Sequence, residues 1–473
     1  MAWSSASLLV FLVLLASPYL GCSYHTSYTH GGKHYTVRSN RDPRQPQQSC
    51  SLQHSEPSSS ADGVPVVHRL SPCSPLGNGA RKQEEHPSVA DVLRRDALRL
   101  RSLFGADNHG SPAPSPLPGG GGSDDGVSIP NRGAPIEELP GAFDYHVVAG
   151  FGTPAQPFIM GFDTHTTGAT LLQCQPCAAN QPCGHAFDPS ASSSIAQVPC
   201  GSPDCPFHGC SGRSCSLNNT FIGNVSFVTD TLTLTPSTTI GSFRFACLEV
   251  TPSDNSSGVL DLSRNSHSLA SRAPSPPGTV AFSYCLPSSP GSVGFLSFGA
   301  AMPMPHKAIY TPLRKNPDNG NLYVVDLVGL RLGGPDLPLP PTAIARDTIV
   351  DLRTTFTYLK PGMYAALRDG FHRWMSRYPV APPLGGLDTC YNFTGLDIFT
   401  VPTVTLKFAG GADVDLSMDE MMYFSDPKDH FSIGCLAFGA RDDTAVIGSR
   451  VQMSTEVLYD LRGEKIGFVP YRC

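Results

Sequence analysis

The chain is poor in charge: Asp, Glu, Lys and Arg make up only 15% of its 473 residues, and the formal net charge is −6. Gly and Pro are abundant instead, with 46 and 45 residues. This balance favours a turn-rich, largely β protein over a helical bundle. Because the chain lacks an excess of positive charge, we expect no binding to nucleic acid.

Long apolar runs are also lacking, with one exception near the N-terminus. Residues 8–20 are apolar and are followed by small residues at positions 21–23. This run is too short to span a bilayer comfortably and is typical of a secretory signal peptide, which we place at residues 1–23. No later stretch reaches membrane-span length and the sequence ends without a hydrophobic tail, so we expect a secreted protein without a membrane anchor.

Cysteine, in contrast, is frequent, and 12 of the 15 cysteines lie between positions 174 and 473. An even number in a secreted globular region indicates a disulfide framework. The alternative is a zinc site at Cys174, Cys177 and Cys183, but few histidines lie nearby and an oxidising compartment disfavours thiolate ligands. We therefore expect no metal and no cofactor. Glycosylation triplets, which suit the secretory route, begin at Asn218, Asn224, Asn255 and Asn392.

Residues 24–140 differ in composition from the rest, being rich in Ser, Pro, Gly and His, with a linker-like tract at 110–126. One helix is predicted here, because Ser88 can cap it and apolar residues recur near helical spacing from Val89 to Leu100. Four arginines make it basic: Arg94, Arg95, Arg99 and Arg101. A helix and a linker between a signal peptide and a globular region are typical of a prosegment. The alternative is a flexible arm that stays attached.

From residue 141 onward, short strands alternate with turns rich in Gly, Pro, Asn and Asp. Strands are predicted at 144–152, 158–162, 227–234, 243–250, 323–332, 401–408 and 456–469. The one strong helical pattern covers residues 363–378, with Pro361 just ahead of it. The pattern predicts an all-β fold with few short helices.

Two parts of this region repeat the same pattern. In the first, an apolar strand delivers Asp163 to a loop, and in the second an apolar strand delivers Asp351. Each half later carries a short apolar run, at 258–261 and at 445–448. Such a duplication predicts two lobes that each bring one carboxylate to a shared cleft.

Two such carboxylates can hydrolyse peptides. Asp side chains about 3 Å apart cannot both ionise, so they share a proton and activate a water held between them. The loop that carries each Asp needs a small hydroxyl residue and then Gly, because Gly adds no Cβ and tolerates unusual backbone angles.

From about residue 144 to 473 the chain resembles the pepsin-like aspartic peptidases (family A1), specifically the plant nepenthesin type. The resemblance rests on Gly152–Gln156, Phe162–Thr164, Gln173–Cys177, Phe187–Ser190, Phe282–Pro287, Leu387–Phe393, Ile466–Phe468 and the Cys-rich insert at 174–215. It implies a bilobal fold of two related β-barrel-like lobes, at 141–306 and 307–473. It also implies catalytic roles for Asp163 and Asp351, a monomer, a peptide or protein substrate or a secreted protein ligand in the cleft, and an apoplastic or vacuolar location.

The resemblance further implies how the twelve cysteines pair. The expected disulfides are Cys174–Cys177, Cys183–Cys247, Cys200–Cys215, Cys205–Cys210, Cys285–Cys473 and Cys390–Cys435. Cys22 lies in the predicted signal peptide, and Cys50 and Cys73 lie in the segment that follows.

The chain departs from the family where its chemistry takes place. Asp-Thr/Ser-Gly is replaced by Asp163-Thr164-His165 and by Asp351-Leu352-Arg353. Leu352 removes a hydroxyl that joins the two loops in relatives, and an inward Arg353 would keep both carboxylates ionised. Asp261 stands where relatives have Gly, and the stretch 215–230 lacks the Tyr of the hairpin that closes the cleft in relatives.

Two of these departures have alternative interpretations. His165 is either a new base or, by default, a side chain that fills space in a relaxed loop. Asp261 is either a third acid or, by default, a solvated turn residue. Two functional hypotheses follow: a secreted family member with lost or weakened catalysis that acts as a binder or inhibitor-like pseudoenzyme, or an active aspartic-type endopeptidase made as a zymogen.

Overall fold

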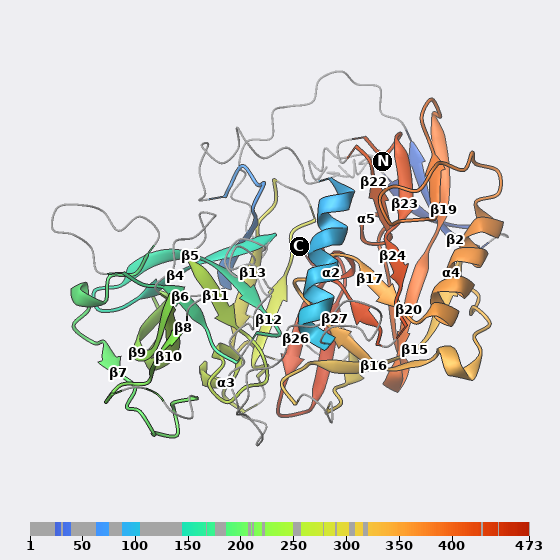
Figure 1. Cartoon of the computed structure of the whole chain (residues 1–473). Coiled ribbons are helices and arrows are strands. Elements are labelled where there is room, and N and C mark those ends of the chain that lie inside the picture. The colour runs from blue at the N-terminus through green and yellow to red at the C-terminus, as the bar shows by residue number, and fades with distance from the viewer. Residues whose placement is uncertain are drawn as a thin grey trace, which may run out of the picture.

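A computed structural model of the chain is shown in Figure 1. It describes residues 24–29, 32–38, 63–74, 88–104, 144–166, 168–175, 186–206, 210, 212–219, 223–248, 257–277, 279–288, 291–301, 308–315, 320–426, 429–442 and 444–472. The predicted signal peptide and the linker tract lie outside these residues. No helix within them is long and apolar enough to cross a membrane.

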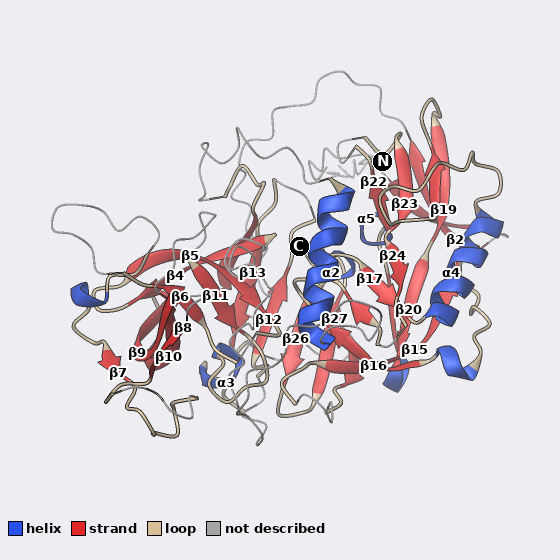
Figure 2. Cartoon of the chain, viewed as in Figure 1, coloured by secondary structure: helices blue, strands red, loops and turns tan. Residues whose placement is uncertain are grey.

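Strands dominate the described chain and helices are few (Figure 2), which confirms the all-β prediction. The largest sheet contains, in spatial order, β14 (Ile309–Pro312), β27 (Lys465–Val469), β26 (Glu456–Asp460), β12 (Phe282–Cys285), β13 (Gly294–Phe298), β3 (Gly63–His68), β4 (Tyr145–Phe151), β5 (Gln156–Asp163), β11 (Gly258–Asp261), β6 (Leu171–Gln173), β10 (Thr238–Leu248), β9 (Gly223–Thr235) and β7 (Ala196–Gln197), with β8 (Ser216–Asn219) against β9.

The second half of the chain has a seven-stranded sheet of its own. Its order is β21 (Ala412–Asp415), β20 (Val404–Phe408), β15 (Val324–Leu332), β16 (Ala345–Val350), β25 (Val446–Ile447), β17 (Thr357–Leu359) and β24 (Phe438–Ala440). Two three-stranded sheets flank it, one of β1 (Tyr24–Thr29), β2 (Gly32–Arg38) and β19 (Ile398–Pro402), the other of β18 (Cys390–Asn392), β23 (Ile433–Leu436) and β22 (Met422–Phe424).

The α-helices are α2 (Val89–Phe104), α3 (Leu269–Arg272), α4 (Pro361–Trp374) and α5 (Met418–Met421), and short 3₁₀ turns lie at Pro189–Ala191, Pro341–Ala343, Ala409–Gly411 and Ser449–Gln452. The long helix α2 lies between the two β-rich halves (Figure 1). Helix α4 begins at Pro361 itself rather than after it, since a proline at the first helical position lacks only an N–H that has no intrahelical partner.

Two predicted strands are each two strands in the structure. The stretch 401–408 changes sheets at Thr403, so β19 pairs with β2 while β20 pairs with β15 and β21. The stretch 456–469 is a hairpin of β26 and β27.

The internal repeat corresponds to the same arrangement of strands in both halves. β5 pairs in parallel with β11, and β16 pairs in parallel with β25. The main-chain N–H of Leu262 donates to the carbonyl of Asp163 at 2.8 Å, and that of Asp351 donates to the carbonyl of Ile447 at 3.0 Å. In each half the Asp therefore leaves the carboxyl end of a strand that the later apolar run supports.

The disulfides in the structure differ from most of the cysteine pairs that we expected. The structure pairs Cys390 with Cys435 as expected, but it also forms Cys174–Cys247, Cys200–Cys210 and Cys205–Cys215. The four expected bonds of Cys174, Cys183, Cys200 and Cys205 are therefore wrong, because strand register decides the partners: β6 lies beside β10 and places Cys174 next to Cys247. The sulfurs of Cys205 and Cys210, an expected pair, still lie 3.8 Å apart, so the expected and the observed pairing of these cysteines differ by a small movement of the sulfur atoms. Cys177, Cys183 and Cys473 lie outside the described residues.

Asn224 and Asn392, which begin two of the glycosylation triplets, are exposed. The side chain of Asn218 and the whole of Asn255 lie outside the described parts of the chain, so glycosylation stays a prediction.

Gly448 gives a stability test of the supporting run in the second half. A Cβ at this position would lie 2.2 Å from the carbonyl oxygen of Phe356, whereas a Cβ at Gly241 would meet nothing within 4 Å. We expect Gly448→Ala to lower the free energy of unfolding by about 3 kcal/mol, because a backbone oxygen cannot move aside. Thermal unfolding should show a lower Tm for Gly448→Ala and little change for the control Gly241→Ala. Equal Tm values would contradict the close packing.

Candidate active site

Asp163 and Asp351 meet between the two halves and are almost fully buried, with exposed fractions of 1% and 0%. Each is held by its own loop: the N–H of His165 donates to Asp163 Oδ1 at 2.9 Å, and the N–H and hydroxyl of Thr354 donate to Asp351 Oδ2 at 2.8 and 2.6 Å. Thr164 Oγ1 also donates to the carbonyl of Val350 at 3.3 Å, which links the two loops. The predicted pair is thus brought together.

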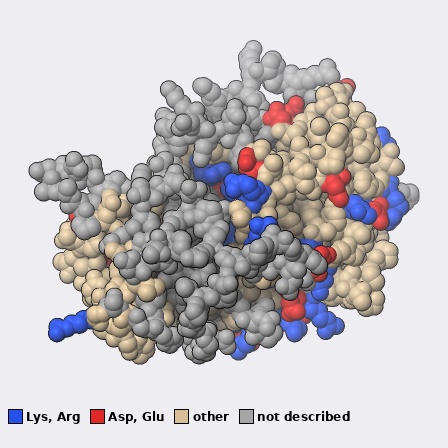
Figure 3. All heavy atoms as spheres, in the orientation of Figure 1, with Lys and Arg blue, Asp and Glu red and all other residues tan. Residues whose placement is uncertain are grey.

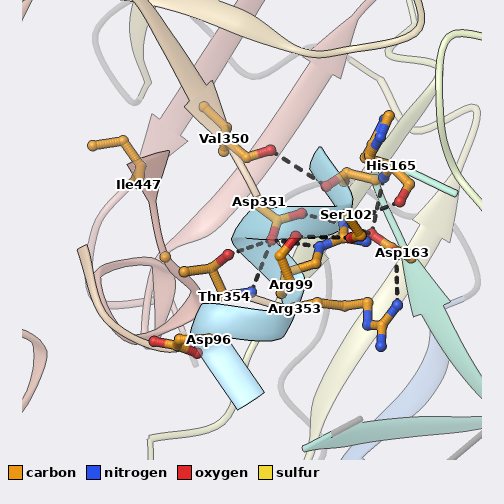
Figure 4. Close-up of polar contacts among 12 residues, drawn as sticks. Asp96, Arg99, Ser102, Asp163, His165, Val350, Asp351, Arg353, Thr354 and Ile447 are labelled. Carbon is orange, nitrogen blue, oxygen red and sulfur yellow. Dashed lines mark hydrogen bonds and ion pairs between the residues drawn. The ribbon is translucent and has the colours of Figure 1, made fainter. Parts of the chain in front are cut away.

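The guanidinium of Arg99, from helix α2, lies between the two carboxylates (Figure 4). Its Nη2 donates to Asp163 Oδ1 at 2.8 Å and also contacts Asp351 Oδ1, while its Nε donates to Asp351 Oδ2 at 3.0 Å. The same Nη2 donates to the carbonyl of His165 at 3.0 Å. One side chain of the N-terminal segment therefore occupies the place between the carboxylates.

Burial and Arg99 act in opposite directions on the two acids. For Asp163, burial raises the pKa to about 6, since the lowering effect of Arg99 is partly offset by the charge of Asp351. For Asp351, burial is outweighed by the charge and hydrogen bonds of Arg99 and by the hydrogen bonds of Thr354, and the pKa falls to about 2. The pair is asymmetric, with Asp351 the more acidic group.

A second polar contact of α2 lies one helical turn before Arg99. The buried carboxylate of Asp96 accepts hydrogen bonds from the N–H groups of Thr355 and Phe356, at 2.8 and 3.0 Å, and from the hydroxyl of Tyr358 at 3.1 Å. These donors belong to the stretch that follows Asp351. Helix α2 is therefore bound to the second Asp loop through both an anion and a cation.

The predicted helix in the N-terminal segment is confirmed, including its cap: the N–H of Asp91 donates to Ser88 Oγ at 3.2 Å. The sequence showed that this helix is basic, but not which arginine points inward. Arg94 and Arg101 are exposed whereas Arg99 is buried, and basic side chains gather at the surface near the middle of the molecule (Figure 3). The signal that could have indicated Arg99 is its place on the apolar face of the helix, next to Leu100.

The residues that replace the family motif lie at the site. Arg353 points inward, with Nη1 3.9 Å from Asp163 Oδ2 (Figure 4). Leu352 is buried and joins the hydrophobic core. Burial and the nearby Arg99 lower the pKa of His165 to about 3, and its buried Nδ1 has no hydrogen-bond partner among the described residues. His165 is thus a neutral side chain and a weak base.

Asp261 is not the solvated turn residue that the default interpretation predicted. Its exposed fraction is 0%, and its Oδ1 accepts a hydrogen bond from the N–H of Ser263 at 2.8 Å. Burial raises its pKa, partly offset by the hydrogen bonds of Ser263 and Thr166. The prediction failed because β11 ends between β5 and β6, inside the lobe, rather than at a surface turn.

The hairpin at 216–235 is formed by β8 and β9, which pair from Ser216 opposite Ser226 to Asn219 opposite Gly223. No Tyr occurs in either strand. The aromatic hydroxyl expected from the family is therefore missing from both strands of this hairpin.

Comparison with known proteins now gives the family. A family model described as xylanase inhibitor N-terminal matches residues 145–300, and one described as xylanase inhibitor C-terminal matches residues 322–470. An aspartyl protease family protein of Arabidopsis thaliana is 32% identical over 448 residues, which is 88% of each chain. The chain belongs to the pepsin-like aspartyl protease family.

Further aspartyl proteases, and one solved structure, are similar to this chain over most of its length. Aspartyl protease AED1 of Arabidopsis thaliana is 32% identical over 90% of each chain, and the aspartic proteinase nepenthesin-2 of Nepenthes gracilis is 29% identical over 70% of this chain and 78% of its own. The crystal structure of basic 7S globulin from soybean has a TM-score of 0.54 at 21% identity and covers 70% of this chain and 95% of its own, which shows the pepsin-like fold.

Asp96 makes the stability of the chain depend on pH in a defined direction. Burial, partly offset by its hydrogen bonds, raises its pKa from 3.8 to about 6. The folded state thus favours the protonated carboxyl, so this stability is fully present below pH 3.8 and is lost as the pH rises through 6. Relative to Asp96→Asn, which cannot ionise, the wild type should lose on the order of 2 kcal/mol of unfolding free energy between about pH 4 and 7.

Urea unfolding of both proteins at the two pH values measures this difference. The matched control is Asp442→Asn, which removes a carboxyl at an exposed position. A wild type that gains stability relative to Asp96→Asn as the pH rises would contradict the assignment.

Proposed function

We propose that this protein is a secreted member of the aspartyl protease family with lost or much weakened catalysis, which acts as a binder or inhibitor-like pseudoenzyme. The observation that carries the proposal is the position of Arg353, whose Nη1 lies 3.9 Å from Asp163 Oδ2. Arg353 belongs to the loop of Asp351 itself. A departure of α2 would take Arg99 away but would leave Arg353 in place.

A cation beside the pair opposes the chemistry that the two carboxylates would perform. Peptide hydrolysis needs one protonated and one ionised carboxyl with a water between them. A guanidinium lowers the pKa of a neighbouring carboxyl and so opposes the protonated form that one of the two groups must keep. Arg353 acts in this direction on Asp163, against the effect of burial, which raises the pKa of that carboxyl to about 6. His165 does not replace the missing proton, because its lowered pKa keeps the imidazole neutral and a poor base.

The partner proposed for such a binder is a secreted protein. The two family models are described as halves of a xylanase inhibitor. By analogy alone, this supports a secreted glycan-degrading enzyme as the class of partner. The predicted signal peptide and the disulfides fit a secreted protein.

A second candidate function is an acid endopeptidase made as a zymogen. The contact of Arg99 with both carboxylates favours this function. A cation from the N-terminal segment would block two catalytically competent aspartates until that segment leaves. The two candidates differ in what removal of Arg99 does.

The variant Arg99→Ala separates them. If catalysis is lost, neither the wild type nor Arg99→Ala should cleave a denatured protein between about pH 3 and 5, because Arg353 still faces Asp163. Product peptides are measured by mass spectrometry with and without pepstatin, and Arg99→Ala with Asp163→Asn is the control. Cleavage by Arg99→Ala that pepstatin and Asp163→Asn both abolish would establish the zymogen function instead.

Restoring the family residues tests the cause of inactivity. We expect the combination of His165→Gly, Leu352→Ser and Arg353→Gly, added to Arg99→Ala, to raise cleavage by about 10²-fold or more over Arg99→Ala alone, because the shared proton becomes possible again. Arg213→Gly, added to Arg99→Ala in place of the three changes, is a matched control that removes an exposed arginine elsewhere. Continued inactivity of the restored protein would assign the loss to the missing hairpin Tyr and to Asp261.

A further inference from the structure

We propose that the N-terminal segment, residues 24–104, is a permanent part of the protein and not a removable prosegment. When the chain is cut between α2 and β4, this segment remains bound and the product is a complex of two chains. The proposal rests on three separate attachments of the segment to the rest of the molecule. It does not depend on whether the two aspartates are active.

The first attachment is a strand added to the edge of the second half. β2 pairs with β19 in antiparallel register from Arg38 opposite Ile398 to His34 opposite Pro402. Tyr35 and Val37 of β2 have exposed fractions of 2% and 0% and belong to the main hydrophobic core. The hydroxyl of Tyr35 donates to the carbonyl of Leu416 at 2.7 Å. This strand is packed as an internal strand and is not a loosely lying arm.

Lys33, the residue just before the stretch paired with β19, adds polar contacts to the same edge. The N–H of Lys33 donates to the carbonyl of Gly333 at 2.8 Å, and its carbonyl accepts from the N–H of Thr403 at 3.2 Å. Its ammonium group pairs with Asp415. Loss of β2 would leave the main-chain groups of β19 and of Gly333 without these partners.

The second attachment lies inside the largest sheet. β3 is hydrogen-bonded on one side to β13 and on the other to β4, so it is not an edge strand. Val64 and Val66 have exposed fractions of 3% and 0%. Because β3 joins strands from distant parts of the chain, its departure would open two sheet edges and uncover apolar core at once.

The third attachment is α2, bound by Arg99 and Asp96 and by apolar contacts at each end. Val89 and Val92 pack in a cluster with Phe356 and Leu387, and Leu100 packs in another that includes Ile349. A buried arginine that loses both carboxylate partners, or carboxylates that lose the arginine, would leave charges unpaired inside the protein.

The second and third attachments share one residue, Asp144, at the start of β4. Arg69, just after β3, approaches Asp144 Oδ1 with its Nε at 3.3 Å, and Arg95 of α2 donates to the same oxygen at 3.0 Å. Burial would raise the pKa of Asp144, but these two arginines outweigh it and lower the pKa to about 2. Strand and helix are thus joined to the first half at the same point.

Three attachments on one segment reinforce one another, because the whole segment dissociates only when all three are open at the same time. After a cut, each attachment that opens is held near its place by the other two, so it closes again before the whole segment dissociates. The segment therefore remains bound with a much slower dissociation than any one attachment would allow. A consequence is that Arg99 of α2 continues to occupy the place between the two aspartates, and a protein partner would have to bind another face of the molecule.

The experiment cuts the full chain at one place. A recognition sequence for a site-specific protease replaces residues 115–121, and Cys50→Ser and Cys73→Ser ensure that no disulfide of the segment holds it after the cut. Size-exclusion chromatography and native mass spectrometry at pH 7 and 5, after dilution to nanomolar concentration, then show whether the two fragments stay together. We expect co-elution at both pH values and unchanged hydrogen exchange at β13 and β19. Separate elution of the N-terminal fragment, or faster exchange of both strands after the cut, would overturn the proposal.

Matched variants test how much each attachment contributes to holding the segment. Arg99→Ala in the cut protein should still co-elute, because β2 and β3 remain, whereas Arg99→Ala combined with Val37→Asp and Val66→Asp should release the fragment. Release by Arg99→Ala alone would show that one contact holds the segment and would overturn the proposal of three attachments. Arg101→Ala, a change at an exposed arginine of α2, should leave the complex intact.

Discussion

The contact around which the site is organised is one buried cation between two buried carboxyl groups. Arg99, Asp163 and Asp351 come from three distant parts of the sequence, and burial makes a charge on any of them costly unless the others pair with it. The contact places α2 between the two halves and links both Asp loops to the N-terminal segment, which β2 and β3 also attach to the rest of the molecule.

The same contact explains why the site looks both inherited and altered. The loops still present Asp163 and Asp351 to a common point, and Thr164 still links them through the carbonyl of Val350. Around that point, however, this chain carries more positive charge than the family motif, which has Gly where Arg353 stands. With Arg99 bound, Arg353 is a second cation near Asp163, and the imidazole of His165 stays neutral. Burial raises the pKa of Asp163 and Arg99 lowers that of Asp351, while both carboxylates face guanidinium groups, so the site as it stands is built around ion pairs.

Much of the fold followed from local sequence patterns. The all-β class, the helix with its Ser88 cap, and an Asp-bearing strand with a later apolar run in each half were predictable, because periodicity and capping act between near neighbours. That these runs pair with the Asp-bearing strands was seen only in the structure. The cysteine pairs could not be predicted in this way, since Cys174 meets Cys247 through the register of β6 and β10. Nor could the burial of Asp261, because a turn signal does not say what lies on either side of the strand end.

The sequence by itself determined that two related lobes each carry one Asp at the end of an apolar strand, and that the residues after each Asp depart from the family motif. Only the tertiary structure decided that Arg99 lies between those carboxylates, that Arg353 points inward and that β3 lies within the largest sheet. The reason is physical. Strand and helix patterns are set by neighbours a few residues away, whereas an ion pair between residues 99 and 351 forms only when the whole chain has folded around it.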